Sequence, residues 1–288
     1  MSGWTTANLR HLLQMFRYGA NPVAGVYDSL GADLWLAPAE GWLNLGLWEG
    51  PGDESEAPAA VRRLVETLAA ELPHAGVVVD VGNGLGAQDP VIAEVARPRR
   101  IVAINITESQ LRAGRHRVER AGAVPVVADA TRLPLHSASA DGVISVEAAF
   151  HFSSRPAFFA ETRRVLRPGG VLAMSDVAVE RLPHGPLEAL AGVTNLRFWG
   201  IQAGAIAGAE VIRTQAAAAG LADVRVTRCS ERVIDPAIRL FRGRVDDGHE
   251  VPLGHRLVAR TMLSQWELLR RRGMLEYILL TASAPAAV

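Results

Sequence analysis

Lysine is absent from this 288-residue chain, cysteine occurs once, and the charges cancel. The 30 basic residues are therefore all arginine, and 30 acidic residues balance them to a formal charge of zero. This balance leaves no basic footprint for a nucleic-acid backbone or an acidic membrane surface, so we disfavour both as partners. The single cysteine, Cys229, excludes an intramolecular disulfide and a cysteine-based metal cluster. We assign the missing lysine to a GC-rich bacterial coding bias.

Long apolar runs are absent as well. Residues 1–19 carry polar side chains throughout, which argues against a signal peptide, and no later segment is long enough to span a membrane. We therefore expect a cytoplasmic protein. The histidines show no paired spacing typical of metal ligands, so no metal site is predicted. No linker-like stretch divides the chain, which favours one α/β core with additions.

The most strongly patterned stretch is Val77–Gly86, in which valines surround Asp80 and three glycines follow at alternate positions. Such a β-branched run is typical of a central parallel strand covered on both faces. Gly82, Gly84 and Gly86 permit positive φ and remove the Cβ atoms that would keep a ligand from the backbone. Because ligands of open α/β sheets bind beyond the carboxyl ends of the strands, the stretch predicts a loop for a phosphate- or nucleoside-sized ligand. By itself, the glycine cluster is also compatible with a simple tight turn.

Further apolar runs alternate with helical patterns. We expect strands at 77–81, 100–106, 124–127, 142–147, 171–174, 224–227 and 275–282. We expect helices at 1–19, 54–72, 87–96, from 107, and at 155–166, 205–219, 236–244 and 253–272. This alternation predicts a doubly wound, mostly parallel, seven-stranded α/β sheet of Rossmann type. Its last strand is expected to be antiparallel, as an added hairpin edge. Residues 1–72 are expected to form a helical and aromatic cap on a domain at 73–288.

The glycine loop is followed by Asn105–Thr107, Ala128–Ala130, Leu133–Leu135, a strand at 141–147 and Arg164–Gly170. In this order and spacing the motifs resemble the class I S-adenosylmethionine-dependent methyltransferases. The resemblance covers the chain from about Tyr27 to the C-terminus. The segments Leu43–Gly50, Glu147–His151 and Ser175–Asp176 are similar to the small-molecule branch that tailors natural products, such as the rebeccamycin-type sugar O-methyltransferases.

The resemblance implies a site for S-adenosylmethionine, which leaves as S-adenosylhomocysteine. The three glycines would let the backbone approach the methionyl part, with Asp80 near its amino group. Asn105 stands where the family often has an acid for the ribose hydroxyls, and an uncharged amide accepts only part of that hydrogen bonding.

The same resemblance assigns the adenine end and the cover of the site. Asp129 would accept from the adenine amino group, with Ile106 and Ala130 against the ring. The residues that would close over the cofactor are Tyr27, Asn44 and Trp48. Each acidic or amide residue also has a local interpretation, because Asp80, Asn105 and Asp129 can all cap a turn.

Methyl transfer to an alcohol or amine needs a group that takes a proton. His151 follows the fourth strand at the ligand end of the sheet, and its ordinary pKa suits neutral pH. Asp176 ends the neighbouring strand and would orient that histidine or contact the acceptor, while Glu147 lies in the same region. Alternatively, His151 packs between Phe150 and Phe152, and Asp176 caps the chain after its strand.

The segments 181–203 and 236–272 are expected to roof the acceptor pocket. The aromatic residues expected to line it are Phe198, Trp199, Phe241 and Trp266. Each of them is also compatible with a core position. With the aromatic N-terminal segment, they would enclose a mostly apolar pocket for a drug-sized molecule. The N-terminal helix can cover either its own sheet or the pocket of a neighbouring copy. A homodimer is therefore among the expectations.

We expect methyl transfer to a small-molecule acceptor of secondary metabolism, such as an antibiotic intermediate. Oxygen is the favoured target, with nitrogen and carbon as alternatives. A protein that only binds or cyclises its substrate is a further alternative on the same fold. A nicotinamide-dependent oxidoreductase is disfavoured, because Gly82-x-Gly84-x-Gly86 replaces G-x-G-x-x-G and Asn105 replaces the acid that would bind the ribose.

Overall fold

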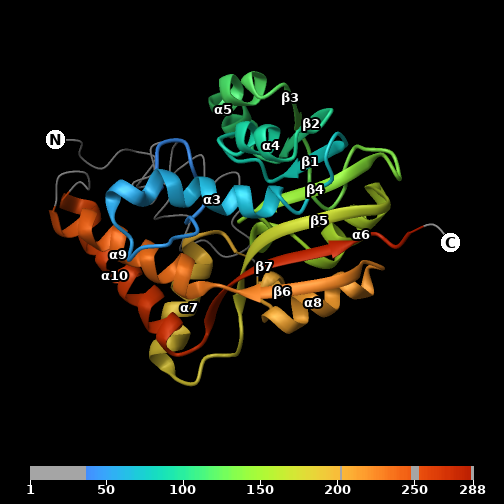
Figure 1. Cartoon of the computed structure of the whole chain (residues 1–288). Coiled ribbons are helices and arrows are strands. Elements are labelled where there is room, and N and C mark those ends of the chain that lie inside the picture. The colour runs from blue at the N-terminus through green and yellow to red at the C-terminus, as the bar shows by residue number, and fades with distance from the viewer. Residues whose placement is uncertain (1–36, 202, 248–252, 287–288) are drawn as a thin grey trace.

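One seven-stranded sheet organises residues 37–201, 203–247 and 253–286, which this computed structural model describes (Figure 1). The strand order is β3-β2-β1-β4-β5-β7-β6, and every neighbouring pair is parallel except those of β7. The predicted doubly wound sheet with an antiparallel last strand is therefore confirmed. The strands are β1 (Val77–Val81), β2 (Arg100–Asn105), β3 (Ala123–Val127), β4 (Ala140–Val146), β5 (Leu166–Val179), β6 (Ala222–Arg228) and β7 (Leu275–Ser283).

Helices cover both faces of the sheet. One face carries α3 (Ala57–Ala69), α4 (Asp89–Val95) and α5 (Glu108–Arg120), and the other carries α6 (Arg155–Val165) and α8 (Ala209–Ala218). Strand β1 serves both layers, because its side chains alternate. Val79 and Val81 belong to the core under α6 and α8, whereas Val78 belongs to the core under α3. The valine-rich strand is thus buried on both faces, as its composition predicts.

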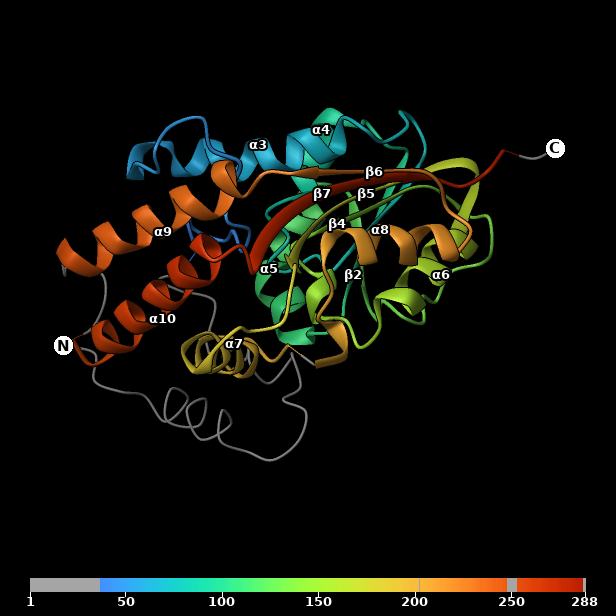
Figure 2. The ribbon, with the colours of Figure 1, turned by 90° about the horizontal axis from the view of Figure 1, so that it is seen from below.

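Three helices gather at the carboxyl ends of the parallel strands: α7 (Pro186–Phe198), α9 (Ser230–Asp247) and α10 (Leu253–Arg271). They lie together at the left of Figures 1 and 2, at the end of the sheet where β5 finishes and β7 begins. The other helical segments of the described ranges are the short 3-10 turns η1 (Glu54–Glu56), η2 (Ala149–His151) and η3 (Ala203–Ala205). The end of the sheet at which ligands bind is therefore roofed by helices.

The structure corrects three sequence predictions. The last strand, β7, is not an edge strand, because it lies between β5 and β6 and the edge is β6. Helix α9 begins at Ser230, six residues before the predicted start at Pro236. Helix α7 was not predicted, since its apolar residues are spread around the helix and Leu187 and Leu190 are 72% and 62% exposed. The predicted helix at 1–19 lies outside the described residues.

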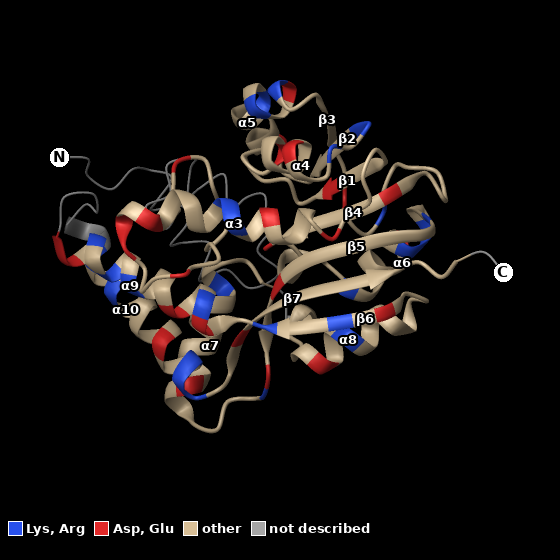
Figure 3. Cartoon of the chain, in the orientation of Figure 1, with Lys and Arg blue, Asp and Glu red and all other residues tan. Residues whose placement is uncertain are grey.

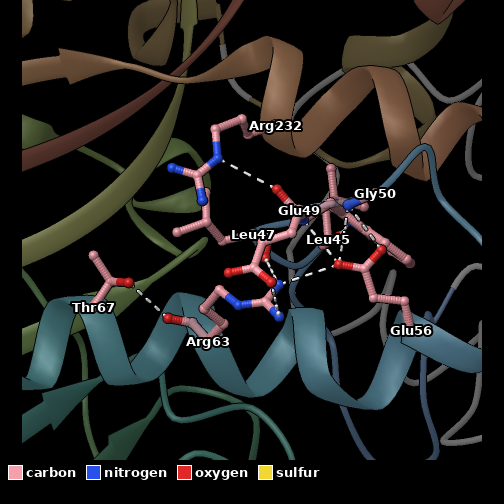
Figure 4. Close-up of polar contacts among 9 residues, drawn as sticks. Leu45, Leu47, Glu49, Gly50, Glu56, Arg63, Thr67 and Arg232 are labelled. Atoms are coloured by element: carbon pink, nitrogen blue, oxygen red, sulfur yellow. Dashed lines mark hydrogen bonds and ion pairs between the residues drawn. The ribbon is translucent and has the colours of Figure 1, made fainter.

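A proline inside α9 creates the anchor for the segment 41–50. Pro236 has no N–H to donate to the carbonyl of Arg232, four residues earlier. That carbonyl instead accepts the Trp48 N–H at 2.7 Å, and the Arg232 Nε donates to the Trp48 carbonyl at 3.3 Å. On the other side, Arg63 of α3 donates to the Leu47 carbonyl at 2.8 Å (Figure 4). The segment is therefore fixed between two helices, although it has no regular structure of its own.

The charged residues follow the balanced composition. Arginines and acidic residues are interspersed along α5, α9 and α10 (Figure 3). Many of them form exposed pairs, such as Arg112 with Glu108 at 2.7 Å and Arg115 with Glu119 at 2.6 Å. Within the described part of the chain, we find no helix with the length and apolarity that crossing a membrane requires.

Candidate functional site

A cavity opens where β1 to β4 end. We name it the glycine-loop cavity, and its volume is about 300 Å³. Predicted residues meet in it from the loops after these four strands, which is the convergence that parallel strands impose at their carboxyl ends, and from the segment 41–50. Those that line it are Asn44, Gly82, Gly84, Asn105, Ile106, Asp129, Ala130, Glu147 and His151. Residues that sequence reasoning missed also contribute, namely Leu43, Asn83, Gln88, Thr107 and Gln110.

Two of the three glycines shape this cavity directly. Gly82 and Gly84 have φ of +81° and +61°, in the left-handed region that side chains disfavour. A Cβ on Gly82 would lie 2.3 Å from the Cβ of Ala148, which is too close for any residue but glycine. Gly86 also has positive φ, but its missing Cβ faces Val118 of α5 at 2.7 Å and it lines neither cavity. Gly86 therefore serves the packing of the loop against a helix.

Asn105 ends β2, which neighbours β1, and Asp129 follows β3, the next strand beyond β2. Asn105 Nδ2 donates to the Gly84 carbonyl at 3.2 Å and to Gln110 at 2.9 Å, while its Oδ1 accepts from the Thr107 N–H at 3.0 Å. Asp129 Oδ1 accepts from the backbone and the hydroxyl of Thr131, both at 2.8 Å. Both residues therefore cap local turns, and both also border the cavity.

A pair of buried carboxyl groups lies behind the glycine loop. Asn83 Nδ2 donates to Asp80 and Asp89, both at 2.8 Å, and Gln88 Nε2 donates to both oxygens of Asp80 at 2.7 and 2.8 Å. Burial raises the pKa of Asp80, and burial followed by the neighbouring Asp80 charge raises the pKa of Asp89 to about 9. At neutral pH Asp89 therefore holds a proton. Asp80 itself does not line the cavity. Asn83 and Gln88 do, and their side-chain amides are oriented by their hydrogen bonds to Asp80.

The second cavity lies under α7 and α10, and we name it the apolar cavity. Its volume is about 360 Å³. Apolar side chains make up most of its wall. They come from the ends of β5 and β7 and from the roofing helices, and they include Val177, Leu196 and Met274. Two of the predicted aromatic residues, Trp199 and Trp266, line it with ring centroids 6.0 Å apart. This is the wall composition of a pocket for an apolar small molecule.

Glu147 lies where the two cavities adjoin. It and Leu43 are the described residues that line both of them. Glu147 directly follows β4, and its φ of +50° is rare for a residue with a side chain. Its Oε1 accepts from the Leu45 N–H and from the Tyr277 hydroxyl, each at 2.7 Å. Burial raises the pKa of Glu147 to about 7, although these two hydrogen bonds oppose the shift.

His151 lines the glycine-loop cavity but not the apolar cavity. It ends η2, only 8% of its surface is exposed, and its ring centroid is 4.1 Å from that of Phe150. Burial, followed by the positive charge of Arg155, lowers the pKa of His151 to about 3. The imidazole is therefore neutral at pH 7, and it is a much weaker proton acceptor than an ordinary histidine.

Asp176 forms a buried ion pair and lines neither cavity. Its Oδ2 lies 2.6 Å from Nε of Arg155, and the side chains are 0% and 2% exposed. Arg155 also donates to the carbonyls of Ala205 and Val177. The prediction that Asp176 contacts the acceptor therefore has no geometric support. Its carboxylate also accepts from the Phe150 N–H, next to His151, and an orienting role for His151 stays a prediction. The pair instead joins α6 and η3 to β5 beneath the site.

Comparisons with known proteins agree on one family. A model described as a methyltransferase domain matches residues 79–174. An erythromycin 3''-O-methyltransferase of Saccharopolyspora erythraea is 30% identical over 273 residues, which cover 90% of this chain and 89% of that protein. The chain belongs to the class I S-adenosylmethionine-dependent methyltransferases.

Solved structures support the fold of this methyltransferase. The cyclopropane synthase MmaA2 from Mycobacterium tuberculosis has a TM-score of 0.74 at 17% identity, over 91% of this chain and 97% of its own. The [4+2]-cyclase SpnF has a TM-score of 0.70 at 18% identity, over 93% of this chain and 98% of its own. At these identities the likeness concerns the fold alone.

The glycine-loop cavity fits the cofactor that the family implies. The positive-φ turn leaves no Cβ between the backbone and a ligand at Gly82 and Gly84. Asn83 lines the cavity, and its Oδ1 is buried and accepts no hydrogen bond from the described residues. An acceptor in that state is suited to the ammonium group of a methionyl ligand. Ile106 and Ala130 offer apolar surface beside Asp129, as an adenine ring requires.

Several predicted site residues lie elsewhere. Trp48 is 1% exposed in the core beneath α9, where its Nε1 donates to the Leu45 carbonyl at 2.8 Å, so it does not close over a cofactor. Phe241 is fully buried in the same core, and Phe198 lines neither cavity. Tyr27 lies outside the described residues. Within those residues no group of three side chains suited to a metal ion occurs.

The first prediction concerns the proton on Asp89. Because the folded pKa is raised, folding takes up a proton between the ordinary Asp value near 4 and about 9, and stability falls as the pH rises through this range. Asp89→Asn keeps a neutral group there at every pH. Its free energy of unfolding, measured with urea from pH 5 to 9, should decline less than that of the wild type.

Glu94→Gln on the exposed end of the same helix is the control, and its pH dependence should match the wild type. Parallel curves for Asp89→Asn and the wild type would show that Asp89 is ionised in the folded protein.

The second prediction concerns the pair of Arg155 and Asp176. Asp176→Asn leaves a buried guanidinium without its counter-charge, which should lower the free energy of unfolding by about 3–5 kcal/mol. Chemical denaturation measures this difference. Glu108→Gln, which breaks an exposed pair on α5, should leave the unfolding midpoint essentially unchanged. Equal effects of the two substitutions would refute a structural role for the buried pair.

Proposed function

We propose that this methyltransferase transfers the methyl group of S-adenosylmethionine to a hydroxyl group of an uncharged, apolar small molecule. The observation that carries the proposal is the contact between the two cavities. One is suited to an adenosyl ligand, the other to an apolar molecule, and they share the side chains of Leu43 and Glu147. A methyl donor and an acceptor in these cavities would face each other at that boundary.

The wall of the apolar cavity argues against an anionic acceptor. Arg181 lines it, but its guanidinium is held by Glu188 at 2.8 Å and by the Arg272 carbonyl at 2.7 Å. Asn195 donates to Gln265 at 2.9 Å and accepts from Trp266 Nε1 at 2.6 Å. Arg181 and Asn195 are thus engaged with other groups of the protein, and a phosphate or carboxylate would lose hydration without gaining a free donor from them.

When it is bound, the cofactor supplies an electrophilic methyl group on a sulfonium sulfur. The chain's own part is to hold the two ligands in line and to exclude water, which are the main sources of rate in such a displacement. The glycine loop and Asp129 would hold the donor. Trp199, which directly follows α7, and Trp266 of α10 would confine the acceptor. The segment 41–50, fixed between α3 and α9, forms the partition at Leu43.

The relatives favour oxygen as the methylated atom. The Saccharopolyspora protein and several fungal relatives are named as O-methyltransferases. Methylation at nitrogen or carbon, or cyclisation without transfer, are the alternatives, and the fold of SpnF shows that this architecture also serves a cyclase. Mass spectrometry of the product separates them, since only transfer adds a methyl group. A cytoplasmic location, a bacterial source, a homodimer and the 1–72 and 73–288 division stay predictions.

The third prediction tests the assignment of the two cavities. Ala189, Gly192, Val193 and Leu196 follow the i, i+3, i+4, i+7 spacing along α7, and all line the apolar cavity. A Cβ at Gly192 would meet no atom within 4 Å, so Gly192→Phe has room to enter the cavity. We expect kcat/KM for the acceptor to fall by at least about tenfold. The Kd for S-adenosylhomocysteine, measured by calorimetry, should stay unchanged.

Gly243→Phe is the matched control. Gly243 is an exposed helical glycine on α9, its Cβ would also meet no atom within 4 Å, and it lines neither cavity. This variant should keep wild-type kinetics. Loss of cofactor binding in Gly192→Phe would reverse the assignment of the cavities, and wild-type protein that binds no S-adenosylhomocysteine would refute the proposed function.

A further inference from the structure

Glu147 is held by one of its two carboxylate oxygens. Oε1 accepts both the Leu45 N–H and the Tyr277 hydroxyl, whereas no hydrogen bond from the described residues ends on Oε2. The backbone is fixed as well, because the Glu147 N–H donates to the Ser175 hydroxyl at 3.1 Å. Two contacts thus orient the carboxylate, a third fixes its backbone, and one carboxylate oxygen is left available.

The location of this oxygen matters because Glu147 is the only ionisable described residue that lines both cavities. His151 borders only the cofactor side, and the carboxylate of Asp176 is occupied by Arg155. The positive φ of Glu147 is a conformation that costs free energy and is common at functional sites. Its orientation is thus maintained against a local preference.

We propose that Glu147 is the catalytic residue that accepts the hydroxyl proton of the acceptor, and that Tyr277 is a positioning residue for it. This inference rests on the proposed O-methylation. The acceptor oxygen forms a bond to the methyl carbon, and the bond from that carbon to sulfur breaks with its electron pair left on sulfur. The hydroxyl proton passes to the Glu147 carboxylate. The products are a neutral ether, a neutral thioether and a neutral carboxylic acid.

The groups around Glu147 suit this task at neutral pH. Burial raises the pKa of Glu147 to about 7, and the negative charge of Asp176 on β5 adds to the rise. Burial also raises the pKa of Tyr277 on β7 and raises that of Cys229, next to α9, to about 12, so both stay neutral. A base whose pKa is near the working pH combines a large ionised fraction with useful basicity. His151, with its lowered pKa, lacks this match.

The test measures methyl transfer to a panel of uncharged, apolar alcohols by mass spectrometry, together with S-adenosylhomocysteine binding by calorimetry. Glu147→Gln should lower kcat by about 10²- to 10⁴-fold, the usual contribution of a positioned base. Its Kd for S-adenosylhomocysteine should stay close to the wild-type value. Glu267→Gln, a matched substitution outside both cavities, should keep wild-type kcat and Kd.

A pH profile distinguishes a base from a merely structural carboxylate. The wild-type rate should rise through a midpoint near pH 7, since only the ionised carboxylate accepts a proton. Tyr277→Phe removes a donor that favours the ionised form, so this midpoint should move to higher pH. Infrared spectroscopy of the acceptor-free protein should show a carboxylic acid that ionises near pH 7.

The two proposals fail in different ways. Wild-type protein that methylates no hydroxyl overturns the O-methylation on which the inference rests. Active wild-type protein whose Glu147→Gln variant keeps its kcat and pH profile overturns the role of Glu147. If Glu147→Gln does not fold, the Tyr277→Phe profile decides the question, and an unmoved midpoint contradicts the proposal.

Discussion

The turn that follows β4 is the constraint on which the rest of the site depends. There the chain adopts a left-handed conformation at Glu147 that its side chain disfavours, and contacts from other elements hold it. The hydroxyl of Ser175, on β5, accepts from its backbone N–H. Its carboxylate accepts from the Leu45 N–H and from the hydroxyl of Tyr277, which lies on β7. The same turn continues into η2, which places Phe150 in the apolar cavity and His151 in the glycine-loop cavity. The turn at Glu147 thus lies on the boundary between the two cavities and supplies side chains to both of them.

The supporting structure contains more buried charge than stability alone would favour. Asp80 and Asp89 share hydrogen bonds behind the glycine loop, and Arg155 and Asp176 pair beneath η2. Replacing such groups by well-packed apolar residues often leaves the free energy of unfolding unchanged or raises it. The buried charges therefore contribute something other than stability. The first network fixes the glycine loop, and the second holds η2 through the hydrogen bond from the Phe150 N–H to Asp176. We interpret the buried polar groups as the means by which irregular segments hold one shape.

Most of the sheet and the glycine loop could be predicted from the sequence, because short-range patterns determine them. The valines of β1 and the glycines after it carry their own backbone preferences. The long-range contacts carry no such signal. Tyr277 reads as one more residue of an apolar strand, and only the position of β7 beside β5 brings it to Glu147. The aromatic Trp48 was misplaced for the same reason, since Pro236, far along the chain, decides where that segment docks.

The roof of the acceptor pocket was the least predictable part. Helix α7 shows no single apolar stripe, because it has apolar residues both toward the cavity and toward solvent. Its proline at the first turn was the one local signal that could have identified it. The choice among His151, Asp176 and Glu147 also needed the structure, since it depends on which cavity each borders. Burial raises the pKa of both carboxyl groups and lowers that of the histidine, and residue type alone does not indicate these shifts.

A crystal structure with S-adenosylhomocysteine tests the central claim most directly, because that claim concerns where the cofactor and the acceptor bind relative to Glu147. The account predicts the adenosine between the glycine loop and Asp129, with the sulfur directed toward the boundary at Glu147 and the apolar cavity still open. A cofactor in the apolar cavity, or one whose sulfur lies away from Glu147, would contradict it.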